Sequence, residues 1–184
     1  MDASLLLAQA DGHRFVWWPS LVGRNPRAIV ARAVSRTASG RERDLLPSRH
    51  AEVAAATWRR CVGALPGVRA LAGTFVRASS ANCFGTVLAA AGAAGEDEWV
   101  AQEPFESWLT SSSRRGGDDA QPGTVFVWRT ADGVAVHAAV TVGDGWAFEK
   151  ASVEWWTPRV VLAVSDMLRA NRSRGLRLER HHTV

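Results

Sequence analysis

A change to a two-residue repeat after residue 122 constrains the fold more than any other feature of this sequence. Apolar residues alternate with small or polar ones over 123–129, 134–142 and 146–151, and short glycine-containing turns separate these segments. Such alternation is typical of β-strands, because successive side chains point to opposite faces of a sheet. Turns this short join antiparallel neighbours. The sequence therefore predicts an antiparallel meander over residues 123–151.

Helical spacing dominates the chain before this point. It predicts helices over 48–62, 80–91 and 96–109, the last broken at Pro104, with Trp99, Phe105 and Trp108 facing inward. The other predicted elements are a strand over 13–18, a helix over 26–36, a short broken segment over 65–72, a polar surface loop over 110–122, strands over 159–164 and 176–182, and a helix over 165–172.

Helices followed by a meander predict an α+β fold, in which N-terminal helices pack on a C-terminal antiparallel sheet. At 184 residues, the chain is expected to form a single domain over 1–184. Within it, we expect a partly helical N-terminal extension, 1–74, and a core, 75–184.

The composition indicates an ordinary globular protein that does not associate with membranes. Hydrophobic residues make up 47% and charged residues 22%, and no apolar run approaches the roughly 18 residues that span a membrane. Residues 1–8 lack the positive segment and long apolar stretch of a signal peptide, so we expect a cytoplasmic protein. Two cysteines, Cys61 and Cys83, make no disulfide framework, and a cytosolic setting argues against a bridge between them.

The net charge of +4 comes from arginine, since Lys150 is the only lysine. A denser group of arginines lies near the C-terminus, at Arg169, Arg172, Arg174, Arg177 and Arg180. Such a group can bind nucleic acid or another anion, but no nucleic-acid-binding motif accompanies it. A solvated surface is therefore the preferred interpretation, and steep salt dependence of binding would favour the nucleic-acid alternative.

Cys83 stands near the start of the helix predicted over 80–91, which Ser79 and Ser80 can cap. A cysteine in the first turn lies close to the positive end of the helix dipole and to unpaired backbone N–H groups. Both favour the thiolate, the nucleophilic form. Taken alone, Cys83 is also consistent with a small buried hydrophobic residue, because free cysteine is among the most buried residue types.

His137 and Glu149 are predicted to lie near each other on neighbouring strands. Small residues share the face of His137 and leave room for a helix there. A three-residue hairpin loop over 143–145 would pair Val142 with Trp146, Thr141 with Ala147 and Ala139 with Glu149. Glu149 would then lie one diagonal step from His137, about 7–8 Å at the backbone and within reach of its carboxylate. A two-residue turn would reverse this parity.

Each of these residues has a simpler interpretation by itself. His137 can be a polar residue at a strand start, bonded to nearby backbone, and Glu149 can be a solvated charge. Together with Cys83 they provide a thiol, an imidazole and a carboxylate in series, an arrangement that orients a base and stabilises its charged form. This conjunction favours a catalytic site over the separate interpretations.

Three ordered motifs resemble the NlpC-type cell-wall endopeptidases, a family of papain-fold cysteine hydrolases. Residues 82–87, Asn-Cys-Phe-Gly-Thr-Val, are similar to the family's Asp-Cys-Ser-Gly-hydrophobic motif. Residues 122–128, Pro-Gly-Thr-Val-Phe-Val-Trp, resemble its Pro-Gly-Asp-Leu-hydrophobic strand, and residues 137–145 resemble its His-Val-Gly-Ile-Tyr-Leu-Gly-Asn-Gly segment. The resemblance covers residues 75–151, less than half of the chain.

The resemblance implies a papain-like fold with Cys83 as nucleophile, His137 as base and acid, and Glu149 as the orienting group, where the family commonly carries histidine. It also implies an oxyanion hole made by the backbone N–H of the cysteine and a nearby side chain that is often tyrosine. Because the chain has no tyrosine, that second donor is open, with Ser79, Ser80 and Arg77 as candidates and Asn82 also near the thiol.

Two departures from the family bear on the substrate. Asn82 replaces an acidic residue and Phe84 replaces a serine, which predicts a more apolar rim beside the thiol. We therefore expect a small-molecule or peptide substrate other than intact peptidoglycan, cleaved through an acyl-cysteine. The alternatives are an acyltransferase or thioesterase on the same triad, or a catalytically silent papain-like binding module. No cofactor is implied, and His181 and His182 lack the spacing of metal ligands with a cysteine.

Overall fold

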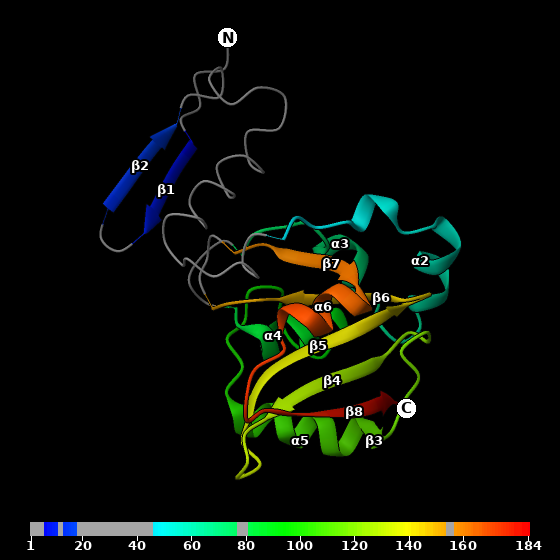
Figure 1. The fold of residues 1–184 in the computed structure, drawn as a ribbon. Helices are drawn as coiled ribbons and strands as arrows, with labels where there is room; N and C mark the ends of the chain where they lie inside the picture. The colour runs from blue at the N-terminus through cyan, green and yellow to red at the C-terminus, as the bar shows by residue number, and fades with distance from the viewer. Residues whose placement is uncertain (1–5, 11–12, 18–45, 77–80, 154–156) are drawn as a thin grey trace. The chain divides into compact units, whose positions relative to one another are not determined.

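The computed structural model describes residues 6–10, 13–17, 46–76, 81–153 and 157–184 (Figure 1). The chain divides into two compact units, Met1–Pro47 and Ser48–Val184. In the first unit, β1 (Leu6–Ala10) pairs antiparallel with β2 (His13–Trp17), which corresponds to the strand predicted over 13–18. The helix predicted over 26–36 lies outside the described residues.

The second unit contains a six-stranded antiparallel sheet, ordered β3-β8-β4-β5-β6-β7. Its strands are β3 (Ser113–Arg115), β4 (Thr124–Arg129), β5 (Ala135–Gly143), β6 (Trp146–Lys150), β7 (Arg159–Ala163) and β8 (Arg177–Thr183). The predicted α+β class and the antiparallel meander are confirmed. The polar loop predicted over 110–122 is wrong in part, because its first residues end a helix and form β3, a short edge strand on β8.

The described helices are η3 (His50–Glu52), α2 (Ala55–Cys61), α3 (Val68–Leu71), α4 (Cys83–Ala90), α5 (Gln102–Ser112) and α6 (Val164–Ala170). The helix predicted over 48–62 is interrupted, because Val53 and Ala54 have extended backbone angles. The helix predicted over 96–109 instead begins at Gln102, and the predicted break at Pro104 is wrong, because Pro104 lies in the first turn of α5, where a missing N–H breaks no intrahelical bond. Trp99 precedes that helix and is exposed, so its predicted inward orientation is wrong.

The core lies between α2–α5 and one face of the sheet. All eight residues of α4 are buried, as expected for a short helix that is apolar on every side. The sheet contributes alternate residues to the same apolar cluster, among them Val125, Val127, Ala138 and Val140. Cys61 and Trp58 from α2 belong to this cluster too, so part of the segment assigned to the N-terminal extension packs with the core of the second unit.

The opposite face of the sheet carries α6. In β5 this face presents His137 and Ala139, which alternate with the core residues. A helix was expected on this face, and it is α6, not the helix that carries Cys83 (Figure 1). In the described ranges, no helix has the length and apolar character needed to cross a membrane.

Candidate active site

Asn82 fixes the start of α4 and therefore the position of Cys83. Its backbone is extended, and its side-chain Oδ1 accepts a hydrogen bond from the N–H of Gly85 at 2.8 Å. Its Nδ2 donates to the carbonyl of Val100 at 2.7 Å, which ties the helix start to the chain leading into α5. Gly85 is needed here, because a Cβ would collide with the carbonyl oxygen of Glu98. The cap is thus Asn82, whereas Ser79 and Ser80 lie outside the described residues.

The thiol of Cys83, the first residue of α4, lies against the start of β5. It interacts with the imidazole of His137 and with the backbone N–H groups of Ala138 and Phe84. Only 9% of Cys83 is exposed. Burial raises the pKa of the thiol, but the hydrogen bond and the charge of His137 outweigh it, so the pKa of Cys83 is lowered from its ordinary value. His137 and the two backbone N–H groups therefore favour the thiolate form of Cys83.

His137 joins the thiol to a carboxylate. Its Nε2 is 2.9 Å from Oε2 of Glu149, and both side chains are buried. Because Nε2 faces Glu149, Nδ1 is the ring nitrogen left for the thiol. Burial lowers the pKa of His137, yet the hydrogen bonds to Cys83 and Glu149 more than compensate and raise it to about 9. Near neutral pH the imidazole is therefore protonated, and it lies between the thiol of Cys83 and the carboxylate of Glu149.

The β5–β6 hairpin reaches the predicted register by an unexpected route. Ala139 opposes Glu149 and Thr141 opposes Ala147, as predicted, but Trp146 opposes Gly143 and not Val142. The loop has two residues, Asp144 and Gly145, both with the positive φ that a type I′ turn requires. A bulge between Thr141 and Gly143 adds one residue to β5 and restores the parity that a two-residue turn would otherwise reverse.

Asn171, at the C-terminus of α6, is a site residue that sequence reasoning missed. Its Nδ2 donates to Oε2 of Glu149 at 2.7 Å and to the carbonyl of Met167 at 3.0 Å, and only 3% of the residue is exposed. Oε2 of Glu149 therefore receives hydrogen bonds from both His137 and Asn171. Trp128, opposite His137 in β4, packs on the imidazole with ring centroids 5.1 Å apart. These neighbours leave the imidazole little room to rotate.

The residues considered for stabilising an oxyanion differ in whether their hydrogen-bond donors are available to a substrate. The N–H of Cys83 belongs to the first residue of the helix and has no intrahelical partner, so it is available to a substrate oxygen. The amide of Asn82 is instead committed to the cap and to Val100. Phe84 does not form an apolar rim, because it is buried and stacks on Phe105 with centroids 4.4 Å apart. Ser79, Ser80 and Arg77 lie outside the described residues.

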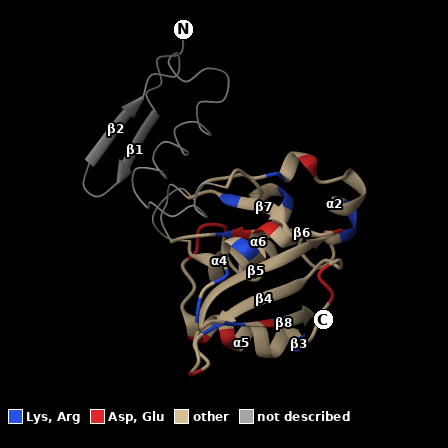
Figure 2. Cartoon of the chain, in the orientation of Figure 1, with Lys and Arg blue, Asp and Glu red and all other residues tan. Residues whose placement is uncertain are grey.

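The C-terminal arginines do not share one surface. Arg177 lies opposite Arg129 in the register of β8 and β4, on the side of the sheet that packs against α2–α5. Arg180 lies on the other side, where it forms two hydrogen bonds with Asp119 and covers the ring of Phe126. Positive and negative segments alternate over the described part of the second unit (Figure 2). The described arginines therefore form no continuous basic stripe.

Comparison of the chain with protein-family models, curated proteins and solved structures found no match. Within the described residues, no three His, Cys, Asp or Glu side chains gather as a metal site would require. Any proposal about the reaction of this protein therefore rests on the site geometry, which is that of Cys83, His137, Glu149 and Asn171.

Proposed function

We propose that this protein is a cysteine hydrolase or acyl-transfer enzyme that works through an acyl-cysteine at Cys83. The observation that carries the proposal is the continuous series from the Cys83 thiol through His137 to Glu149, with Nε2 of His137 2.9 Å from the carboxylate. A polarised thiol, a base that bonds it and a group that orients the base are the parts of a covalent catalyst. The motif resemblance to NlpC-type hydrolases, with a papain-like arrangement, is part of the same proposal.

The first half of the reaction forms the acyl-enzyme. The Cys83 thiolate attacks a carbonyl carbon, and the electrons of the C=O bond move to the oxygen, which the N–H of Cys83 can stabilise. When the tetrahedral intermediate collapses, the bond to the leaving group breaks and that group takes the Nδ1 proton of His137. The products are an acylated Cys83 and a neutral imidazole.

The second half returns the enzyme to its starting state. Neutral His137 removes a proton from water, and the resulting hydroxide attacks the thioester carbon. Collapse of this intermediate expels the Cys83 thiolate beside a reformed imidazolium. Glu149 orients the ring throughout and stabilises it whenever it is protonated. If an alcohol or amine takes the place of water, the same steps transfer the acyl group. Amide cleavage is the preferred reaction, because it is the one that the resembling family performs.

Intact-mass analysis of the full chain tests this proposal. The protein is exposed to a panel of small peptides and activated amides, esters and thioesters, with one arm containing an added amine acceptor. We expect an acyl adduct that peptide mapping places on Cys83 and that hydroxylamine removes. Adducts on Cys61 instead, or no adduct with any acyl donor, would contradict catalysis and leave the silent binding module as the better description.

A further inference from the structure

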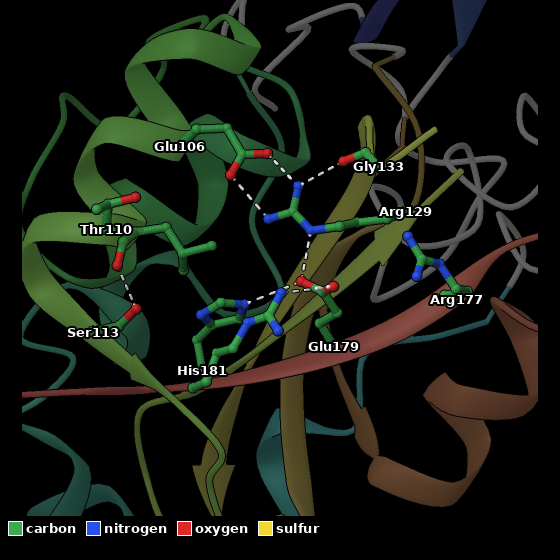
Figure 3. A pocket seen from close by; sticks show the side chains of 10 residues that line it. Glu106, Thr110, Ser113, Arg129, Gly133, Arg177, Glu179 and His181 are labelled. Atoms are coloured by element: carbon green, nitrogen blue, oxygen red, sulfur yellow. Dashed lines mark hydrogen bonds and ion pairs between the residues drawn. The ribbon is translucent and has the colours of Figure 1, made fainter. Parts of the chain in front are cut away.

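The side of the sheet that packs against α2–α5 changes from apolar to charged residues at β8. In β4 and β5 this side presents aliphatic residues, including Val125, Val127 and Val140, whereas β8 presents Arg177, Glu179 and His181. A hollow of about 570 Å³ opens between α5 and the strands β3, β4 and β8 (Figure 3). Neither Cys83 nor His137 lines this hollow. It is therefore separate from the proposed catalytic series.

A network of ion pairs fixes the walls of the hollow. Arg129 donates from Nη2 to Glu106 at 2.9 Å and from Nε to Glu179 at 2.7 Å, and its Nη1 also reaches Glu106 and the carbonyl of Gly133 at 3.0 Å. These bonds join α5, β4 and β8. The hydrogen bond to Glu106 raises the pKa of Arg129, which stays charged. The wall is thus a preorganised polar surface.

The positive charges in the hollow exceed the negative ones. Glu106 and Glu179 face three arginines, Arg115, Arg129 and Arg177. Arg129 uses its donors in the network, and Arg115 makes one contact of 3.3 Å with Glu179 while its side chain is 80% exposed. The exposed side chain of Arg177 makes no hydrogen bond or ion pair with any described residue, and no dashed line reaches it in Figure 3. Arg115 lies opposite His181, four residues along β8 from Arg177, so the guanidinium of Arg177 is the one available to a ligand at its end of the hollow.

We propose that this hollow binds a small oxyanion, a carboxylate or phosphate group, held by the guanidinium of Arg177. A planar guanidinium presents paired N–H donors that match the two oxygens of such a group. The volume lies within the range of about 300–1,000 Å³ found for small-molecule sites. Glu106 and Glu179 neutralise Arg129 and keep the network in place, while the surplus positive charge selects an anion.

Calorimetric titration of the full chain with inorganic phosphate, and separately with succinate, tests the proposal. Ionic strength is held constant, because salt screens non-specific attraction to a basic protein. We expect saturable binding of one or both probes, and the tighter probe identifies the group that the site prefers. Arg177→Ala should weaken that binding by about tenfold, as expected for loss of a charged hydrogen-bonding partner.

Arg172→Ala is the matched control, because it removes the same charge from an exposed arginine that does not line the hollow. It should leave the affinity unchanged, and Arg177→Lys should retain only part of it, since the ammonium lacks the planar pair of donors. Equal weakening by Arg172→Ala and Arg177→Ala would overturn the proposal in favour of non-specific attraction. The absence of saturable binding of both probes to the wild-type chain would also overturn it.

Discussion

The two cysteines of this protein lie in the same apolar cluster and have opposite properties. Cys61 ends α2, is fully buried, and its Sγ donates to the carbonyl of Trp58 at 3.2 Å. Cys83 begins α4 and contacts His137. Burial raises the pKa of the Cys61 thiol, whereas the pKa of Cys83 is lowered despite a burial that acts in the same direction. Position in a helix and the presence of a partner thus separate two thiols with similar burial.

The partner matters more than the helix in this comparison. A charge at a helix end gains roughly 0.3–1 kcal/mol from the dipole, less than the 1.4 kcal/mol or so of a single pKa unit. Burial can raise a pKa by several units. The dipole of α4 is therefore too weak to offset the burial of Cys83 without the imidazolium of His137. The changes described next each remove or weaken one contribution to the difference in pKa between the two thiols.

Replacing the proposed nucleophile should have the largest effect. Cys83→Ala should abolish acyl-adduct formation, because no other described thiol has a base beside it. Cys61→Ala is the control: it opens a small cavity and lowers stability, but the adduct should still form on Cys83. Intact-mass analysis with any acyl donor that labels the wild type compares the two variants. Persistent acylation of the Cys83→Ala variant would assign the chemistry to another residue.

His137→Ala should give Cys83 the properties of Cys61. Burial then acts on the thiol without an opposing charge, so its pKa should rise above the ordinary value of about 8.5. Iodoacetamide labelling across pH, followed by peptide mass, should show the Cys83 midpoint move from below that value to above it. Acylation should fall by about 10²–10⁴-fold with the loss of a general acid–base. Unchanged labelling at neutral pH would mean that the helix and its N–H groups suffice.

The α+β class and the site register could be predicted from local patterns in the sequence, but the geometry behind the register could not. The two-residue repeat and the glycine turns locate β4, β5 and β6 to within a residue or two. The bulge at Val142 leaves no such trace, because it depends on how the strands twist. A two-residue turn and a bulge together give the same pairing of Ala139 with Glu149 as the predicted three-residue loop. The prediction was correct for the wrong reason.

Contacts between distant segments account for the other differences. Asn82 immediately precedes the helix and is as good a cap as serine, so this signal was present and was assigned to Ser79 and Ser80 instead. Asn171 gave no signal, since its role depends on α6 lying over the face of the sheet that carries Glu149. Phe84 was placed on the rim, yet its stacking on Phe105 of α5 draws it into the core.

The pH dependence of acylation distinguishes the role of the Cys83 thiolate from that of His137 as the acid that protonates the leaving group. The thiolate becomes available as pH rises through the lowered pKa of Cys83, so both alkylation and acylation increase there. Above about 9, His137 loses the proton that an amine leaving group needs, and acylation by an amide should fall about tenfold per pH unit. Alkylation by iodoacetamide needs no such proton and should not fall. A decline of both reactions above this pH would point to unfolding.

Glu149→Gln should weaken the site while preserving the fold. The amide can still bond the ring, but it does not stabilise imidazolium and can favour the other tautomer. We expect acylation at least about tenfold slower, because a hydrogen bond to a charged partner is lost. The Cys83 alkylation midpoint should move upward, toward that of Cys61. Glu179→Gln makes the same change elsewhere in the sheet and should leave both readouts unchanged, whereas a wild-type rate for Glu149→Gln would assign the orienting role to another residue.

Asn171→Ala should have the smallest effect and is the most specific test of the newly found contact. Removing its Nδ2 donor releases Glu149 from α6, so the carboxylate holds the imidazolium less firmly. We expect a loss of about three- to tenfold in acylation, the size of one ordinary hydrogen bond. The pH range for activity should also narrow, because the pKa of Cys83 rises while that of His137 falls. Arg169→Ala on the same helix is the control, since its partner is Asp166 and not the triad. If Asn171→Ala lowers the rate without moving either limb of the profile, Asn171 supports the packing of α6 and not the charge on His137.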